Sequence, residues 1–247
     1  MKRNWFSQVW ASVLVNSLYA LVSYPALLIN SMLGPLSILA IITFATQGRL
    51  FEIGIIGALM TTLVSGGVFM QADLSHIKND LKLQDMIVSS PTSEFTYIFG
   101  ISISELIFAI PTIILLLVLA AIFVHVSIVA AFTIVLAIGM IFVLAIAMGF
   151  MFSTFSSDIV QGWGFAGIIS TLLTTLPPVF YPITYIPAPY QYLAYLSPTT
   201  YAAEIAQNAA GFLSLSNFNI LIDWIVLIGA FCVLTYIAVK KARWRAI

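Results

Sequence analysis

Two apolar stretches decide the fold class of this chain. Residues 101–124 read ISISELIFAIPTIILLLVLAAIFV and, after the tripeptide HVS, residues 128–152 read IVAAFTIVLAIGMIFVLAIAMGFMF. The first stretch contains one charged residue, Glu105, and the second contains none. A helix that crosses a bilayer needs about 20 predominantly apolar residues. The pair therefore predicts two membrane-spanning helices joined by a tight turn.

The composition of the whole chain also indicates a membrane protein. Of its 247 residues, 62% are hydrophobic and only 7% are charged, whereas a soluble domain carries roughly 25% charged residues. A soluble chain with so few charges could not cover its surface with polar groups, but lipid requires an apolar surface. The single cysteine, Cys232, excludes an intrachain disulfide framework and a cysteine metal site. We interpret it as a lipid-facing or packed residue.

We expect one all-α integral membrane domain over residues 1–247, with six transmembrane helices. Further apolar segments predict spans at residues 25–46, 53–71 and 218–239, and another span that begins near Ile159.

The region after Ile159 is too long for one ordinary span, because no charged residue occurs between Ile159 and Ala203. Six of the ten prolines lie between Pro177 and Pro198, and a helix does not continue unbroken through such a run. We therefore predict that the fifth span ends between Tyr181 and Ile186. A broken or re-entrant element then follows near the outer surface, over about residues 182–212, where protein or water must shield irregular backbone.

The first residues, about 3–20, predict an amphipathic helix in the headgroup plane. Polar residues recur four apart, and Trp10 lies among apolar residues on the opposite face; the polar positions are Asn4, Gln8, Ser12 and Asn16. A cleaved signal peptide is the alternative, because Lys2 and Arg3 precede apolar residues. A signal core is a continuous apolar run, so the punctuated pattern favours the interfacial helix.

The basic residues predict the orientation in the membrane. With six spans, eight of the nine Lys and Arg residues fall on one side, and only Arg49 falls on the other. Basic residues concentrate in cytoplasmic loops. Both termini and the segment 73–94 are therefore expected on the cytoplasmic side of the cell membrane, and the region rich in Pro and Tyr on the outside.

The sequence offers little for catalysis or ion transport. His76 and His125 lack partners at metal-ligand spacing, and no phosphate loop of the G-x-x-x-x-G-K-[ST] type occurs. We expect no metal site, no cofactor bound by this chain and no nucleic-acid partner. We interpret Glu105 and Asp223 as interfacial, because each lies near a span end. Without charges at the membrane midplane, an ion-driven transporter or charge-lined channel is disfavoured.

The main polar segment lies between the second and third spans, at residues 73–94. Leu74, Ile77 and Leu81 share one helical face, and polar side chains occupy the remainder. A short amphipathic helix of this kind can dock into a groove of a soluble partner. It can equally be an interfacial connection between two spans, and the residues alone leave both interpretations open.

Two local patterns make the chain resemble the type-2 membrane permease subunit of ATP-binding cassette (ABC) exporters. The first is Asp85-Met86-Ile87-Val88-Ser89-Ser90-Pro91-Thr92-Ser93, which leads into Gly100. The second is Pro178-Val179-Phe180-Tyr181-Pro182, followed by Leu196-Ser197-Pro198-Thr199-Thr200-Tyr201-Ala202-Ala203-Glu204. The order of spans resembles this family over essentially the whole chain. The chain departs from the family pattern at Lys82-Leu83 and at Ser197. It also departs at Gln207 or Asn208, because the family usually has a basic residue at that last place.

The resemblance implies a division of labour between subunits. Two permease subunits, as a homodimer or heterodimer in membrane lipid, would form the pathway, and a separate ATP-binding subunit would hold ATP and Mg. The segment at 73–88 would be the coupling helix, with contacts from Leu74, Ile77, Lys78, Asp80, Leu81, Lys82 and Asp85.

Spans two and five would line the pathway, with polar residues Thr61, Thr62, Ser65, Ser170, Thr171, Thr174 and Thr175. The same hydroxyl groups can instead join helices by hydrogen bonds. Walls that are mostly apolar suit an amphipathic or lipid-like substrate. The function expected is export driven by ATP hydrolysed on another chain. A secondary transporter or channel with its own energy source is the alternative, and a membrane enzyme or assembly scaffold is a third possibility.

Overall fold

The computed structural model describes residues 5–23, 26–77 and 93–241, and within these ranges every regular element is helical. This confirms the expected all-α architecture. The chain begins with α1 (Trp5–Val13), a π-helical turn (Leu14–Leu18) and α2 (Tyr19–Ser23). The longer helices are α3 (Ala26–Ala45), α4 (Phe51–Ser75), α6 (Glu94–Phe123), α7 (Ile128–Ser153), α8 (Ile159–Thr174) and α11 (Asn217–Lys241). Between α8 and α11 lie a short 3₁₀ helix (Ile183–Tyr185), α9 (Ala188–Ala194) and α10 (Pro198–Ala209).

Helix lengths support most of the expected spans. Among the described residues, five helices are long and apolar enough to cross a membrane. Four of them match expected spans: Phe51–Ser75, Thr96–Phe123, Ile128–Ser153 and Asn217–Ala238. The fifth, Trp5–Ser23, covers the segment for which an interfacial helix was expected. The apolar parts of α3 and α8 are shorter. The six-span count, and the placement of the N-terminal helix in the headgroup plane, stay predictions.

The expected end of the fifth span, between Tyr181 and Ile186, is wrong for the helix itself. Helix α8 has 16 residues, which gives about 24 Å at 1.5 Å per residue, less than a hydrocarbon core of about 30 Å. It ends at Thr174 because Pro177 and Pro178 follow closely, and proline removes a backbone donor and disfavours helix in the residue before it. Irregular chain and the 3₁₀ helix Ile183–Tyr185 follow α8.

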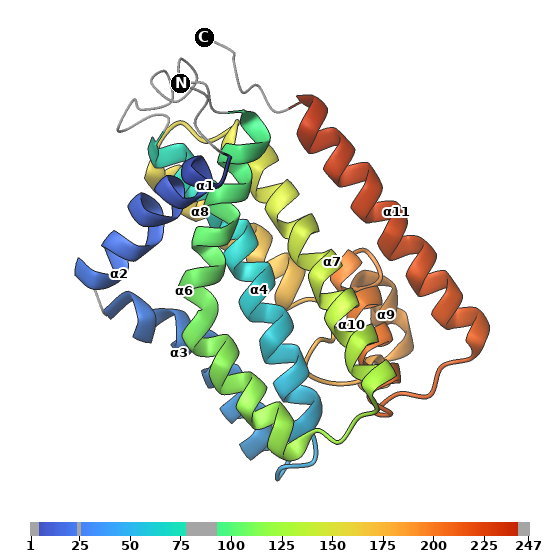
Figure 1. Ribbon diagram of the computed structural model, residues 1–247. Helices are drawn as coiled ribbons and strands as arrows, with labels where there is room; N and C mark the ends of the chain where they lie inside the picture. Colours follow the sequence, from blue (N-terminus) through green and yellow to red (C-terminus); the bar gives the residue numbers. More distant parts are fainter. Residues whose placement is uncertain (1–4, 24–25, 78–92, 242–247) are drawn as a thin grey trace.

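The long helices alternate in direction through one bundle. Figure 1 shows α4, α6 and α7 side by side, with α11 on one flank and the N-terminal helices on the other. Helix α1 lies at the same end of the bundle as the C-terminal ends of α4 and α11, which we call the inner end. The turns between α3 and α4 and between α6 and α7 lie at the opposite, outer end. Arg49 is in the α3–α4 turn, whereas Lys240 is at the inner end of α11.

Helix α4 forms the centre of the bundle and is buried along most of its length. It can approach α7 closely because glycines lie at the crossing: a Cβ atom at Gly149 would lie 2.6 Å from the carbonyl oxygen of Gly67. A Cβ atom at Gly67 would lie 2.9 Å from the Cβ atom of Ala145. The apolar core therefore sits between α4 and α7 and extends to α8 and α10.

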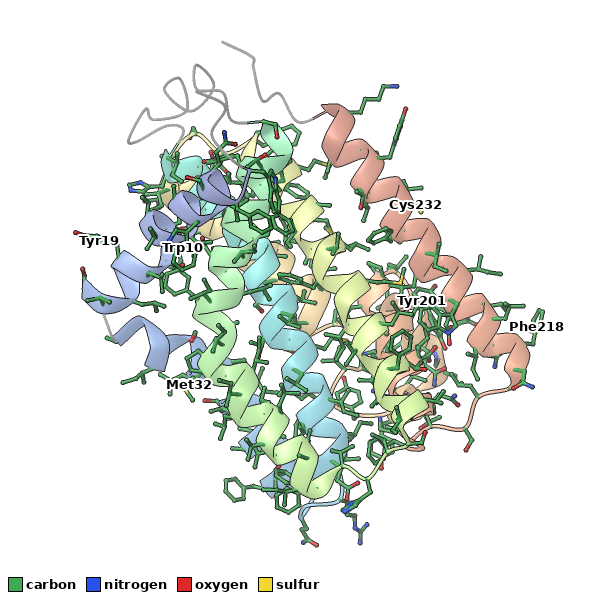
Figure 2. All side chains as sticks on the ribbon, viewed as in Figure 1. Trp10, Tyr19, Met32, Tyr201, Phe218 and Cys232 are labelled. Carbon is green, nitrogen blue, oxygen red and sulfur yellow. The ribbon has the colours of Figure 1, made fainter. Side chains whose placement is uncertain are left out.

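The outer elements pack on this core. Helix α10 contacts α7 and α11, and its N-terminal proline, Pro198, occupies a first-turn position where no backbone donor is needed. Figure 2 shows Tyr201 in this region and Cys232 on α11, where its exposed side chain contradicts the alternative that this chain packs around it. The short helices confirm a broken segment within 182–212, and its re-entry into the membrane stays a prediction.

Candidate transport pathway and coupling site

The polar residues predicted for the pathway on α4 are largely enclosed by this chain. Thr61 and Thr62 are buried, and Thr62 donates to the carbonyl of Ala58 at 2.7 Å. Ser65 on α4 and Ser170 on α8 are joined through their hydroxyl oxygens at 2.9 Å. In this pair, the hydroxyl groups join two helices by a hydrogen bond, which is the alternative to their lining a pathway.

The predicted pathway residues on α8 divide between two faces. Thr174 is buried and donates to the carbonyl of Ser170 at 2.7 Å, so its hydroxyl is satisfied by its own helix. Thr171 and Thr175 are exposed on the other face, and Thr171 donates to the carbonyl of Gly167 at 2.8 Å. The structure thus brings Ser65, Ser170 and Thr174 towards the α4–α8 contact, and leaves Thr171 and Thr175 on a face that this chain does not cover.

The described part of the predicted coupling segment continues from α4. Helix α4 runs to Ser75 without a break, so Leu74 belongs to it and is buried in a cluster with Met70, Tyr97 and Ile101. Ile77 is partly buried against the same cluster. Five predicted coupling residues lie outside the described residues: Lys78, Asp80, Leu81, Lys82 and Asp85.

The sequence favoured interfacial over buried positions for Glu105 and Asp223, and the structure corrects this preference, because both side chains are buried by protein. Glu105 is 8% exposed and Asp223 is 4% exposed. Helix α6 begins at Glu94, about three turns before Glu105, whose carboxyl group faces that of Asp73 on α4. Asp223 lies in the second turn of α11, which packs against α7 and α10.

A second group of polar side chains lies where α10 meets α11. The hydroxyl of Tyr195 donates to Oε1 of Glu204 at 3.0 Å, and the hydroxyl of Tyr201 donates to the carbonyl of Tyr195 at 3.0 Å. Glu204 is outside the spanning helices and 3% exposed. Burial, and then the negative charge of Asp223, raise the pKa of Glu204 to about 7, while the bond from Tyr195 opposes this shift.

Sequence reasoning missed the hydrogen bonds made by two buried glutamines. Nε2 of Gln71 on α4 donates to the hydroxyl of Ser156 at 3.0 Å, and Nε2 of Gln207 on α10 donates to the carbonyl of Pro178 at 2.8 Å. Gln207 also donates to the carbonyl of Tyr181 at 3.2 Å and so fastens the irregular chain after α8. The sequence did carry a signal for these bonds, namely an uncharged polar residue within an apolar helix. A buried polar group of this kind needs a hydrogen-bond partner.

The comparison with protein families identifies the family to which this arrangement of helices belongs. The family described as ABC-2 type transporter matches residues 1–210 of the chain. No curated protein matches it. The match covers more than half of the 247 residues and includes all the helices from α1 to α10. The chain therefore belongs to the ABC-2 type transporter family, as the membrane permease component of an ABC transporter that works with a separate ATP-binding subunit.

Proposed function

We propose that this chain is the permease subunit of an ATP-driven exporter that moves an amphipathic or lipid-like substrate outward across the cell membrane. The family match carries the proposal, because an ABC-2 permease is the membrane component and not the ATPase. ATP and Mg would be bound by the partner subunit, and residues 73–94 would receive its motion.

The apolar character of α4 and α8 supports the substrate class. Most of their hydroxyl groups bond to carbonyls of the same helix or to each other, as Thr62, Thr174 and the Ser65–Ser170 pair do. Few polar groups then remain to bind a strongly charged substrate. Amphipathic substrates need apolar walls with a small number of polar contacts.

A second permease subunit would complete the pathway. The exposed face of α8 carries Thr171 and Thr175 together with large apolar side chains such as Ile168 and Leu172. In a dimer, this face would meet its counterpart or line the space between the two copies. Both termini would be cytoplasmic, in line with Lys240 at the inner end and Arg49 at the outer end.

The test is to purify the chain with a candidate ATP-binding subunit and measure ATP hydrolysis in proteoliposomes. We expect a stable complex in which substitution of Asp85 or Leu81 lowers ATP turnover stimulated by the permease. Movement of substrate down an ion gradient by the chain alone, without ATP, would contradict the proposal and favour a secondary transporter or channel. Chemical turnover by the isolated chain would favour an enzyme.

A further inference from the structure

Polar side chains tie the inner ends of α4 and α8 together. Nε2 of Gln71 donates to the hydroxyl of Ser156 at 3.0 Å and lies 3.4 Å from the carbonyl oxygen of Gly162. One turn later, the hydroxyl of Ser75 donates to the carbonyl of Asp158 at 3.0 Å. Gln71 and Ser75 are both fully buried. We call these five residues the inner joint.

The backbones also touch at the inner joint. A Cβ atom built at Gly162 would lie 3.1 Å from the Cα atom and 3.6 Å from the Cβ atom of Ala72. A hydrogen-bonded contact with this little free space resists sliding, because packed interfaces move between discrete arrangements and do not deform continuously.

The connection between α7 and α8 is fixed to the same place. Oδ1 of Asp158 accepts from the backbone amide of Gln161 at 2.8 Å, which caps the first turn of α8. The side chain of Gln161 accepts in turn from the backbone amide of Ser157 at 2.7 Å. The last turn of α4, the α7–α8 connection and the first turn of α8 are therefore held by one continuous set of hydrogen bonds.

The inner joint differs from the polar residues elsewhere on these helices. Thr62 on α4 and Thr174 on α8 bond only to carbonyls of their own helices at 2.7 Å each. Such bonds do not connect two helices. Apart from the Ser65–Ser170 pair, the described bonds between α4 and the α8 region lie at the inner end, where α4 continues into the expected coupling segment.

We propose that the inner joint makes the inner ends of α4 and α8 one rigid unit, which carries motion of the coupling segment to α8 and the α7–α8 connection. Gln71 and Ser75 are then positioning residues for transport. The inference rests on the proposed function, because it requires a partner subunit that moves α4. Without the joint, α4 would move while α8 stayed behind.

A disulfide lock tests the rigid unit directly. The 3.6 Å between the Gly162 and Ala72 Cβ positions falls within the range of about 3.5–4.5 Å that disulfides adopt. The variant Ala72→Cys, Gly162→Cys is made with Cys232→Ala, because the native cysteine is exposed. We expect the oxidised complex with the ATP-binding subunit to keep the ATP turnover that it shows after reduction. Loss of turnover on oxidation, restored by reductant, would overturn the proposal.

Removing the polar contacts tests whether the joint transmits motion. Gln71→Leu should fold. The substitution removes the Nε2 donor and also the buried Oε1, which accepts no hydrogen bond from the described residues, so leucine leaves no unsatisfied polar atom of its own. A reporter cysteine, Val160→Cys, is placed on an exposed position in the first turn of α8, again with Cys232→Ala. The rate of its reaction with N-ethylmaleimide is compared between the ATP-free complex and the complex trapped with ATP and vanadate.

We expect trapping to change this rate in the parent chain. In Gln71→Leu the change in reaction rate should be about fivefold smaller, which is the factor that corresponds to the free energy of one neutral hydrogen bond. ATP hydrolysis should continue. Ser104→Ala is the control, because its buried hydroxyl bonds to the carbonyl of Gly100 within α6, and it should behave as the parent. An equal response in Gln71→Leu, or none in the parent, would overturn the inner joint's role. A parent chain that binds no ATP-binding subunit would contradict the proposed function itself, and the joint's role with it.

Discussion

The carboxyl group of Glu204 makes the stability of the outer region depend on pH. Its pKa is raised from 4.5 to about 7, chiefly by burial and then by Asp223. The folded chain therefore holds a proton that the unfolded chain releases between pH 4.5 and 7, so stability is lost as the pH rises through this window. Glu204→Gln removes the titration and keeps an oxygen that can accept from Tyr195, which donates at 3.0 Å in the native chain.

The size of the effect follows from the same shift. A difference of about 2.5 pH units between 4.5 and about 7 corresponds to about 3.4 kcal/mol at about 1.36 kcal/mol per unit. Solvent near the cluster screens part of this, and we expect about 1.5–2 kcal/mol. For a chain of 247 residues, this amounts to a rise in melting temperature of about 3–8 °C.

The assay is thermal unfolding of the purified chain in detergent at pH 4.5 and pH 8. Glu204→Gln should melt higher than the native chain at pH 8 and at nearly the same temperature at pH 4.5. Glu52→Gln, at an exposed position in the first turn of α4, is the control and should give the same small change at both pH values. A Glu204→Gln chain that gains no stability at pH 8 would refute the reasoning that Glu204 is buried next to a second carboxylate.

Three further predictions follow from the packing. Gly67→Leu should destabilise the α4–α7 crossing by about 3 kcal/mol or more, because even a Cβ atom there would lie 2.9 Å from the Cβ atom of Ala145. Gly66→Leu is the control and should be tolerated, because no atom lies within 4 Å of its Cβ position. Equal melting temperatures for both variants would contradict this prediction. Gln207→Leu should cost about 1–3 kcal/mol, because the carbonyls of Pro178 and Tyr181 lose their donor, and an unchanged melting temperature would rule out that role. With Cys232→Ala, a cysteine at exposed Ser214 should react with an impermeant maleimide from outside the cell and one at exposed Ser157 should not; the reverse would overturn the orientation. Ser197, an obvious alternative reporter in the outer segment, is buried and unsuitable.

The membrane class and most helix positions could be predicted from the sequence, because they depend on local properties. Apolar runs predict spans wherever the hydrocarbon core must be crossed, and α3, α7 and α11 begin and end within about two residues of the predicted limits. The proline cluster correctly predicted a break after α8, because proline acts on its own helix. The family resemblance, which rests on local patterns in the chain, is confirmed over residues 1–210.

Contacts between distant segments could not be predicted in this way. The burial of Glu105 was not predicted, because the local pattern did not indicate that α6 begins at Glu94 or that Asp73 on α4 faces its side chain. Gln71 and Gly162 are 91 positions apart in the chain, and neither residue carries a local signal for the other. The sequence alone determined that the chain is helical, apolar and broken at the proline cluster between Pro177 and Pro198. The tertiary structure decided which polar groups are buried together, because this depends on which faces of α4, α8, α10 and α11 meet.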